Sequence, residues 1–314
     1  MKILQVHARY RVRAGEDTVA DQEAAALRRA GHDVVRVIAE NPTGAAASVA
    51  ALARAVDNRA AAARVARAVA DVRPDVVHVH NTWFALSSSA VAAAASSAAP
   101  VVMSVHNFRL GCLGTDLFRD GAICTACIGR GPWTGVRHAC YRDSRVLSAV
   151  QALEIAVTRR RGVLPEAVTL FVAPTRFTAD RLVDIGLPAE RMVVKPHFTA
   201  DPGPRPAPPS ASDEVLAVGR LAPGKGTATL VDAWRTSSRH DHGRLVVIGD
   251  GPDADIVRRA DVRNVELLGW LDRDAVTARL LRARALVAPI ERYEPFGMVL
   301  IEAMSAGLPV VVTR

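Results

Sequence analysis

The stretch Glu214-Val-Leu-Ala-Val-Gly-Arg-Leu-Ala-Pro-Gly-Lys-Gly-Thr227 decides the fold of this protein. Its first residues have the apolar, β-branched composition of a buried strand, a glycine-rich turn follows, and the pattern predicts a helix that opens at Thr227. A strand, a tight turn and a helix in this order aim backbone N–H groups at a site where phosphate can bind. Arg220 and Lys225 flank the turn and can add two positive charges. The alternative is that both are solvated side chains on a surface turn.

The turn is close to the loop that binds nucleoside triphosphates, because Gly219 and Gly224-Lys225 have the required spacing. However, Gly226 follows the lysine at the position where that loop has a serine or threonine whose hydroxyl holds magnesium. The segment therefore predicts a site in which protein cations, without a metal, neutralise a diphosphate.

A second motif, Tyr293-Glu-Pro-Phe-Gly-Met-Val-Leu-Ile-Glu302, has two carboxylates eight positions apart. We expect Glu294 on the loop that leaves an apolar strand at 285–289, and Glu302 about a turn and a half into a helix that starts near Phe296. The open N–H groups of Phe296, Gly297 and Met298 would then face the same cleft as the carboxylates. This arrangement suits the polyhydroxylated groups and the phosphates of a sugar nucleotide.

Short β-branched runs alternate with helical stretches along the chain, which predicts an α/β protein with doubly wound parallel sheets. The runs are Ile3–Ala8, Val34–Ala39, Val76–His80, Val101–His106, Leu170–Pro174 and Met192–Lys195, then Glu214–Gly219, Leu245–Gly249, Val265–Gly269, Leu286–Pro289 and Pro309–Thr313. The proline-rich segment 199–212 cannot extend a helix or a central strand, so we expect a linker there. The prediction is a first domain of residues 1–198 and a second of residues 213–314. Two such sheets that face each other form a cleft at the carboxyl ends of their strands.

Three ordered motifs resemble the retaining glycosyltransferases of family 4, which have the two-domain GT-B architecture. The matching residues are Glu294 and Glu302 for the Glu-x7-Glu motif, Gly219-Arg220-Leu221 with Lys225-Gly226 for the Gly-Arg-Leu-x-x-x-Lys-Gly motif, and Val247–Pro252 for a glycine turn between them. The resemblance covers essentially the whole chain. It implies transfer of a sugar, with retention at the anomeric carbon, from a UDP- or GDP-sugar to a saccharide or lipid-linked acceptor, in cell-surface polysaccharide or glycoconjugate synthesis. It implies no cofactor for catalysis.

The resemblance also assigns roles to individual residues. Glu294 would orient the sugar hydroxyls, Glu302 would bind the ribose, and His106 would lie near the transferred sugar. Residues assigned to catalysis are Glu294, His106, Arg220 and Lys225, and those assigned to donor binding are Gly15, Gly219, Gly249, Phe296, Gly297, Met298 and Glu302. Family members often have two glycines in the loop after the first strand, and here Ala14 replaces one of them. For His106 the alternative is a partly buried histidine that caps a loop.

All four cysteines, Cys112, Cys124, Cys127 and Cys140, lie in an insertion at 108–143 that is rich in glycine and arginine. Four thiols with one Cys-x-x-Cys can bind a structural zinc ion and so order a loop with little apolar core. The equal alternative is a cluster of reduced, packed thiols, whereas paired disulfides do not fit a reducing cytoplasm. The helix 144–158 after the insertion has an apolar stripe and ends in three arginines. We interpret it as a core helix, with peripheral contact to an anionic membrane as the alternative.

Composition limits the other functions. The net charge of +8 and the pI near 10 favour anionic partners. Few aromatic side chains are available for base stacking and no nucleic-acid module is recognisable, so nucleic acid is not expected to be a partner. The first residues have too short an apolar run for a signal peptide, which predicts a cytoplasmic protein, at most peripheral at the inner face of the plasma membrane. Family members usually continue past residues 309–313, so the second domain is expected to be incomplete. A truncated fragment, a non-catalytic sugar-nucleotide-binding protein and a GT-B epimerase are therefore alternatives to a transferase.

Overall fold

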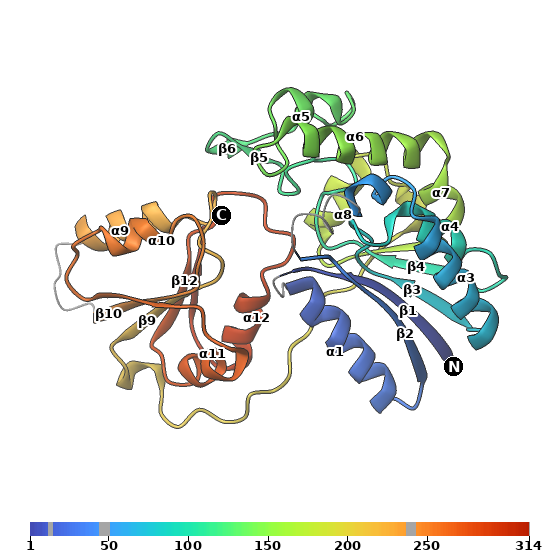
Figure 1. The fold of residues 1–314 in the computed structure, drawn as a ribbon. Coiled ribbons are helices and arrows are strands. Elements are labelled where there is room, and N and C mark those ends of the chain that lie inside the picture. The colour runs from blue at the N-terminus through green and yellow to red at the C-terminus, as the bar shows by residue number, and fades with distance from the viewer. Residues whose placement is uncertain (12–14, 44–50, 237–242, 314) are drawn as a thin grey trace. The chain divides into compact units, whose positions relative to one another are not determined.

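The computed structural model describes residues 1–11, 15–43, 51–236 and 243–313, and it divides into two compact units (Figure 1). Unit 1 comprises residues 1–117 and 124–197, and unit 2 comprises residues 118–123 and 198–314. Each unit contains a parallel sheet covered by helices. Every strand predicted from the sequence is present, with ends that differ by at most two residues.

Unit 1 is built on a six-stranded parallel sheet with the order β2-β1-β3-β4-β7-β8. Its strands are β1 (Lys2–Arg9), β2 (Asp33–Glu40), β3 (Val76–Val79), β4 (Val101–Ser104), β7 (Leu170–Ala173) and β8 (Met192–Val194). Its helices are α1 (Gly15–Arg29), α3 (Arg59–Val72), α4 (Ser87–Ala94), α5 (Trp133–Arg137), α6 (Arg145–Arg160), α7 (Val163–Ala167) and α8 (Arg176–Asp184), with a short 3₁₀ helix at Ala189–Arg191. Strand β1 lies between β2 and β3, so the order of the strands across the sheet changes direction at β1.

Unit 2 is built on a five-stranded parallel sheet with the order β11-β10-β9-β12-β13. Its strands are β9 (Glu214–Val218), β10 (Arg244–Ile248), β11 (Val265–Gly269), β12 (Ala285–Ala288) and β13 (Val310–Val312), and β5 (Phe118–Arg119) and β6 (Ala122–Ile123) form a separate hairpin. Its helices are α9 (Thr227–Thr236), α10 (Ala254–Arg258), α11 (Arg273–Leu280) and α12 (Met298–Ser305), with a 3₁₀ helix at Pro209–Ala211. The order of the strands across this sheet changes direction between β9 and β12.

Both faces of the sheet are covered at the central strands β9 and β10, which explains why these strands are almost continuously apolar. Successive residues of a strand point to opposite faces. Val215 and Ala217 accordingly pack in one core cluster with residues of α9 and α10, whereas Leu216 packs in another with residues of α11 and α12. Figure 1 shows these two pairs of helices on opposite sides of the strands.

The proline-rich segment 199–212 is irregular apart from its 3₁₀ turn, as its composition predicted. Arg205 attaches it to unit 2. Its guanidinium donates hydrogen bonds to the carbonyl oxygens of Leu280 (2.9 Å), Ala283 (2.7 Å) and Ala306 (2.9 Å). A single arginine thus satisfies carbonyl groups near the ends of two helices, which holds the segment against the unit it leads into.

Helix α6 departs from the predicted stripe. Its buried face consists of Ser148, Gln151, Ala152, Ile155 and Thr158, so it is more polar than expected. Val146 and Leu153 are apolar residues of this predicted core helix, but they are 69% and 45% exposed. The reason is that burial follows the i, i+3, i+4, i+7 spacing set by the neighbouring elements, whichever residues occupy it. None of the described helices has the length and apolar character needed to cross a membrane.

Candidate active site

The glycine turn after β9 and the loop after β12 come together in unit 2. The backbone N–H groups of Glu291 and Arg292 donate to the carbonyl oxygen of Gly224 at 2.9 and 3.2 Å. Strands β9 and β12 pair in parallel at the point where the chain order reverses. Ligands of open α/β sheets bind outside the carboxyl ends of the strands at such a point. The two motifs singled out in the sequence therefore meet at one place.

Lys225 and Glu294 form an ion pair across these two loops. The Lys225 Nζ atom lies 2.5 Å from Glu294 Oε2, and the two side chains are 21% and 25% exposed. Sequence analysis gave these residues separate tasks on phosphate and sugar and did not anticipate their direct contact. Arg220 is exposed and makes no ion pair with the residues that the structure describes. The turn thus presents one cation held by a carboxylate and one that extends into solvent.

Gly226 has a steric reason for lacking a side chain. Its φ is +74°, and a Cβ atom there would lie 1.8 Å from the carbonyl oxygen of Pro289. A serine or threonine, which a magnesium-binding triphosphate loop requires, does not fit in this conformation. Gly249 after β10 is equally close-packed, since its Cβ would lie 1.8 Å from the Gly219 carbonyl oxygen. The loops at this sheet end are therefore packed backbone to backbone.

The helix of the second motif begins later than predicted. Helix α12 starts at Met298, so Phe296 lies in the preceding loop and Gly297 is the N-cap residue. The cause is the left-handed conformation of Gly297 (φ +81°), which a right-handed helix cannot include. The Gly297 carbonyl accepts from Leu300 N at 3.0 Å. Of the three amides expected at the helix N-terminus, only that of Met298 belongs to the helix.

Glu302 lies a little more than one turn into α12, closer to its start than the predicted turn and a half. It faces Arg273 at the start of α11, with 3.4 Å between Oε1 and a guanidinium nitrogen. Burial raises the pKa of Glu302, and Arg273 opposes this shift. A ribose that bound to Glu302 would replace or share the contact with Arg273.

Five histidines gather at the carboxyl end of the first sheet. They are His7 on β1, His78 on β3, His80 and His106 in the loops after β3 and β4, and His197 after β8. His80 Nδ1 lies 3.1 Å from His106 Nε2, and His106 Nδ1 lies 3.4 Å from His197 Nε2. The rings of His80 and His106 are stacked, with 5.4 Å between their centroids. Sequence analysis proposed His106 alone of these five for the site.

The ring of His106 is neutral near pH 7. Burial lowers its pKa to about 4, and burial also lowers the pKa of His197 to about 4. Burial lowers the pKa of His80 well below its ordinary value. The imidazoles can therefore donate and accept hydrogen bonds without carrying charge, which suits contact with a sugar hydroxyl.

Glu23 of α1 is a residue that sequence analysis missed. Its carboxylate is 6% exposed and pairs with Lys195, with 2.5 Å between Oε1 and Nζ. Burial raises the pKa of Glu23, but His78 and Lys195 outweigh burial and hold it below its usual range. The signal in the sequence was weak, because Glu23 and Lys195 are 172 positions apart and neither belongs to a motif.

A second missed group lies at the start of α1. Tyr10 Oη donates to Glu16 Oε2 at 3.0 Å, and Asn107 Nδ2 donates to Glu16 Oε1 at 2.5 Å. Burial raises the pKa of Glu16. Gly15, which the resemblance assigned to donor binding, is the first described residue of this helix and is exposed, while Ala14 lies outside the described residues.

Among the residues that the structure describes, the cysteines are not gathered around one point. Among the described residues, Glu23, His78 and His80 are the group of potential ligands whose atoms all lie within 4.8 Å of one another, and no three cysteines do so. All four thiols are free of disulfides. Burial raises the pKa of Cys112 to about 11, which disfavours the thiolate that zinc binds. Structural zinc at these cysteines stays a prediction.

Both halves of the chain match known families. Residues 14–197 match the glycosyl transferase 4-like domain, and residues 212–314 match the glycosyl transferases group 1. The chain therefore belongs to the glycosyl transferase 4-like family, as its motifs indicated.

Individual members of the family have low sequence identity to this chain. A glycogen synthase of Mycobacterium tuberculosis is 27% identical over 252 residues, which are 77% of this chain and 52% of the relative. The chain thus spans about half the length of this curated relative. A D-inositol 3-phosphate glycosyltransferase of Segniliparus rotundus is 31% identical over 144 residues, 42% of this chain and 30% of the relative.

Solved structures confirm the fold. A sucrose-phosphate synthase of Thermosynechococcus elongatus covers 99% of this chain with a TM-score of 0.67 and 15% identity, and 80% of that protein is covered. HepE of Anabaena, in complex with UDP and glucose, covers 99% with a TM-score of 0.59 and 17% identity, again with 80% of that protein covered. The GT-B class with two α/β domains, expected from the sequence, is confirmed.

Proposed function

We propose that this protein transfers a glycosyl unit from a nucleotide-sugar to an acceptor hydroxyl, and that protein cations rather than a metal ion stabilise the departing diphosphate. The observation that carries the proposal is the meeting of Lys225 with Glu294 at the switch point of the second sheet, beside the exposed Arg220. The steric exclusion of a side chain at Gly226 supports the metal-free part, since no hydroxyl can take the position of the magnesium ligand.

In this proposal the negative charge that develops on the diphosphate is met by fixed positive groups. Lys225 is oriented by Glu294 before the donor arrives, so little reorganisation is needed as the glycosidic bond breaks. Arg220 adds a planar guanidinium that suits phosphate oxygens. The amides at the start of α12 supply further positive potential. Glu294 then has one oxygen on Lys225 and a second with which to orient a sugar hydroxyl.

The comparisons and the motifs together support the proposed donor class. HepE was solved with UDP and glucose, which supports a UDP-sugar, and the motifs allow a GDP-sugar as well. Retention at the anomeric carbon is part of the proposal because the Glu-x7-Glu motif resembles that of retaining enzymes. A structural neighbour is described as a lipopolysaccharide outer core galactosyltransferase, which supports a saccharide or lipid-linked acceptor in surface polysaccharide synthesis.

The test is incubation of the purified protein with a panel of UDP- and GDP-sugars, with and without candidate acceptors, in the presence of EDTA. Nucleotide release that depends on acceptor and persists in EDTA supports the proposal, and the anomeric configuration of the product reports retention. Conversion of the donor into a stereoisomer would identify an epimerase. Binding without turnover across the panel would identify a sugar-nucleotide-binding protein. An absolute requirement for magnesium or manganese would overturn the assigned mechanism.

A further inference from the structure

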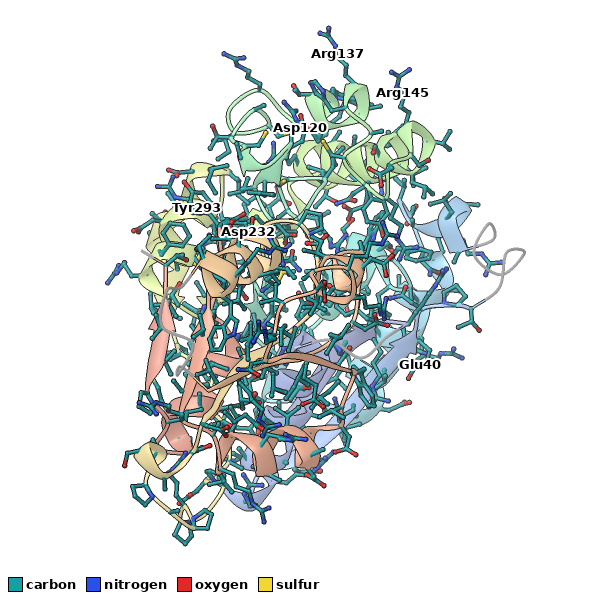
Figure 2. All side chains as sticks on the ribbon, turned by 90° about the vertical axis from the view of Figure 1, so that its left-hand side faces the viewer. Glu40, Asp120, Arg137, Arg145, Asp232 and Tyr293 are labelled. Carbon is teal, nitrogen blue, oxygen red and sulfur yellow. The ribbon has the colours of Figure 1, made fainter. Side chains whose placement is uncertain are left out.

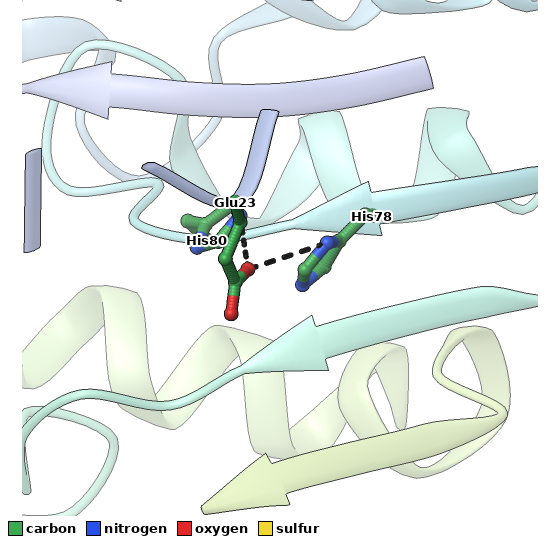
Figure 3. A group of neighbouring side chains, drawn as sticks. All are labelled: Glu23, His78 and His80. Atoms are coloured by element: carbon green, nitrogen blue, oxygen red, sulfur yellow. Dashed lines mark ion pairs between the residues drawn. The ribbon is translucent and has the colours of Figure 1, made fainter. Parts of the chain in front are cut away.

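One carboxylate oxygen in unit 1 is buried without a hydrogen-bond partner. Oε2 of Glu23 lies in the interior, while Oε1 of the same carboxylate is bound to Lys195. An ionised carboxylate oxygen that is buried and unsatisfied costs free energy, so such an atom calls for an explanation. It points between two imidazoles, those of His78 and His80 (Figure 3).

The distances around this oxygen are too long for hydrogen bonds and short enough for a shared ion. Glu23 Oε2 lies 3.8 Å from His78 Nδ1 and 3.6 Å from His80 Nε2. Two ligands on a tetrahedral ion with bonds of 2.0 to 2.2 Å are separated by about 3.3 to 3.6 Å. The two carboxylate–imidazole distances are within a few tenths of an ångström of this range, and all three ligand atoms lie within 4.8 Å of one another.

The second nitrogen of each ring is already held. His78 Nε2 lies 2.9 Å from Ser104 Oγ, and His80 Nδ1 lies 3.1 Å from His106 Nε2. Histidines that bind metals almost always have such a partner on the other nitrogen, which fixes the tautomer and the ring orientation.

From these contacts we propose that Glu23, His78 and His80 form a binding site for a divalent transition-metal ion of the zinc type. Two imidazoles and one carboxylate suit zinc, cobalt or nickel, whereas magnesium and calcium prefer oxygen ligands. Gln5 Nε2 lies 3.1 Å from His80 Nε2, and coordination exchanges this hydrogen bond for a metal–nitrogen bond. The ion would tie α1 to the end of β3, next to His106, and it takes no part in stabilising the diphosphate.

The experiment is titration of the full-length, chelator-treated protein with cobalt chloride, followed by visible absorption, with zinc added afterwards as a competitor. Cobalt held by nitrogen and oxygen gives visible bands alone, whereas cobalt held by thiolates adds intense near-ultraviolet absorption, which separates this site from the cysteines. Glu23→Gln and His78→Gln should each weaken cobalt affinity at least tenfold. Glu154→Gln, a matched change of a half-buried carboxyl in the same unit, should leave it unaltered.

Each outcome decides the proposal. Visible bands that saturate with one equivalent, and that both variants but not Glu154→Gln diminish, support it. Identical titrations for the wild type and for the folded variants overturn it, as does cobalt absorption that is of the thiolate type only. Circular dichroism establishes which variants are folded, and the two independent substitutions keep the test valid if one of them unfolds. Because the donor assay is run in EDTA, failure here leaves the proposed transferase function standing.

Discussion

Gly226 offers a sharp test of the glycine turn after β9, because the structure predicts what a single methyl group does there. In Gly226→Ala the new Cβ would lie 1.8 Å from the Pro289 carbonyl oxygen, while ordinary contact begins at 3.4 Å. The two loops must therefore separate by about 1.6 Å. This displacement would lengthen and weaken the hydrogen bonds that the backbone N–H groups of Glu291 and Arg292 donate to the Gly224 carbonyl oxygen.

The expected loss of stability has three contributions. A left-handed φ costs an L-residue about 1–2 kcal/mol, overpacking adds about 1–3 kcal/mol, and weakening the two loop hydrogen bonds adds about 1 kcal/mol. We expect Gly226→Ala to lower the free energy of unfolding by about 3–6 kcal/mol in total. Turnover of the donor should fall by about 10²-fold, because a misplacement of about 1 Å near the reacting groups has that effect.

Gly269→Ala is the matched control. Its φ is also +74°, but its Cβ would meet nothing within 4 Å, so the substitution carries the conformational cost alone. The effect of alanine on the unfolded chain is the same in both variants and cancels in the comparison. Urea unfolding measures the stability of each, and nucleotide release measures turnover. Equal losses of stability in the two variants would refute the close packing described for this loop.

Three further predictions concern the charges and the surface. Lys225→Met and Glu294→Gln should each lower kcat by at least about 10²-fold while circular dichroism stays unchanged, and near-normal turnover in both would remove the assigned mechanism. Folding lowers the pKa values of His106 and of the histidines beside it, so the unfolded state takes up protons first as the pH falls. The free energy of unfolding should therefore decrease as the pH drops from about 6.5 to about 4, the pKa of His106. Urea unfolding across this range measures the decrease, and His106→Asn should make it shallower. Val146 and Leu153 are exposed on α6, and Arg145 of the same helix points away from the fold (Figure 2). Co-sedimentation of the protein with anionic vesicles should therefore weaken when Val146 and Leu153 both become serine. Equal sedimentation of the variant and the wild type would exclude α6 as a membrane contact.

The fold was predictable because its signals are local. Alternating β-branched runs and helical stretches specify the strands, and the proline-rich segment marks the change of unit. The motif residues Gly219, Lys225 and Glu294 could be located for the same reason, since ligands meet the carboxyl ends of strands. The start of α12 could not, because the left-handed conformation of Gly297 depends on how the loop closes over Leu300 and Glu294.

What the sequence by itself determined is the GT-B class and the position of the glycine-turn and Glu-x7-Glu motifs, since both depend on patterns a few residues long. Only the tertiary structure decided that Lys225 pairs with Glu294, that Pro289 forbids a side chain at Gly226, and that Glu23 meets His78, His80 and Lys195. These contacts join residues far apart in the chain. Their existence depends on strand order and packing, which local periodicity does not encode.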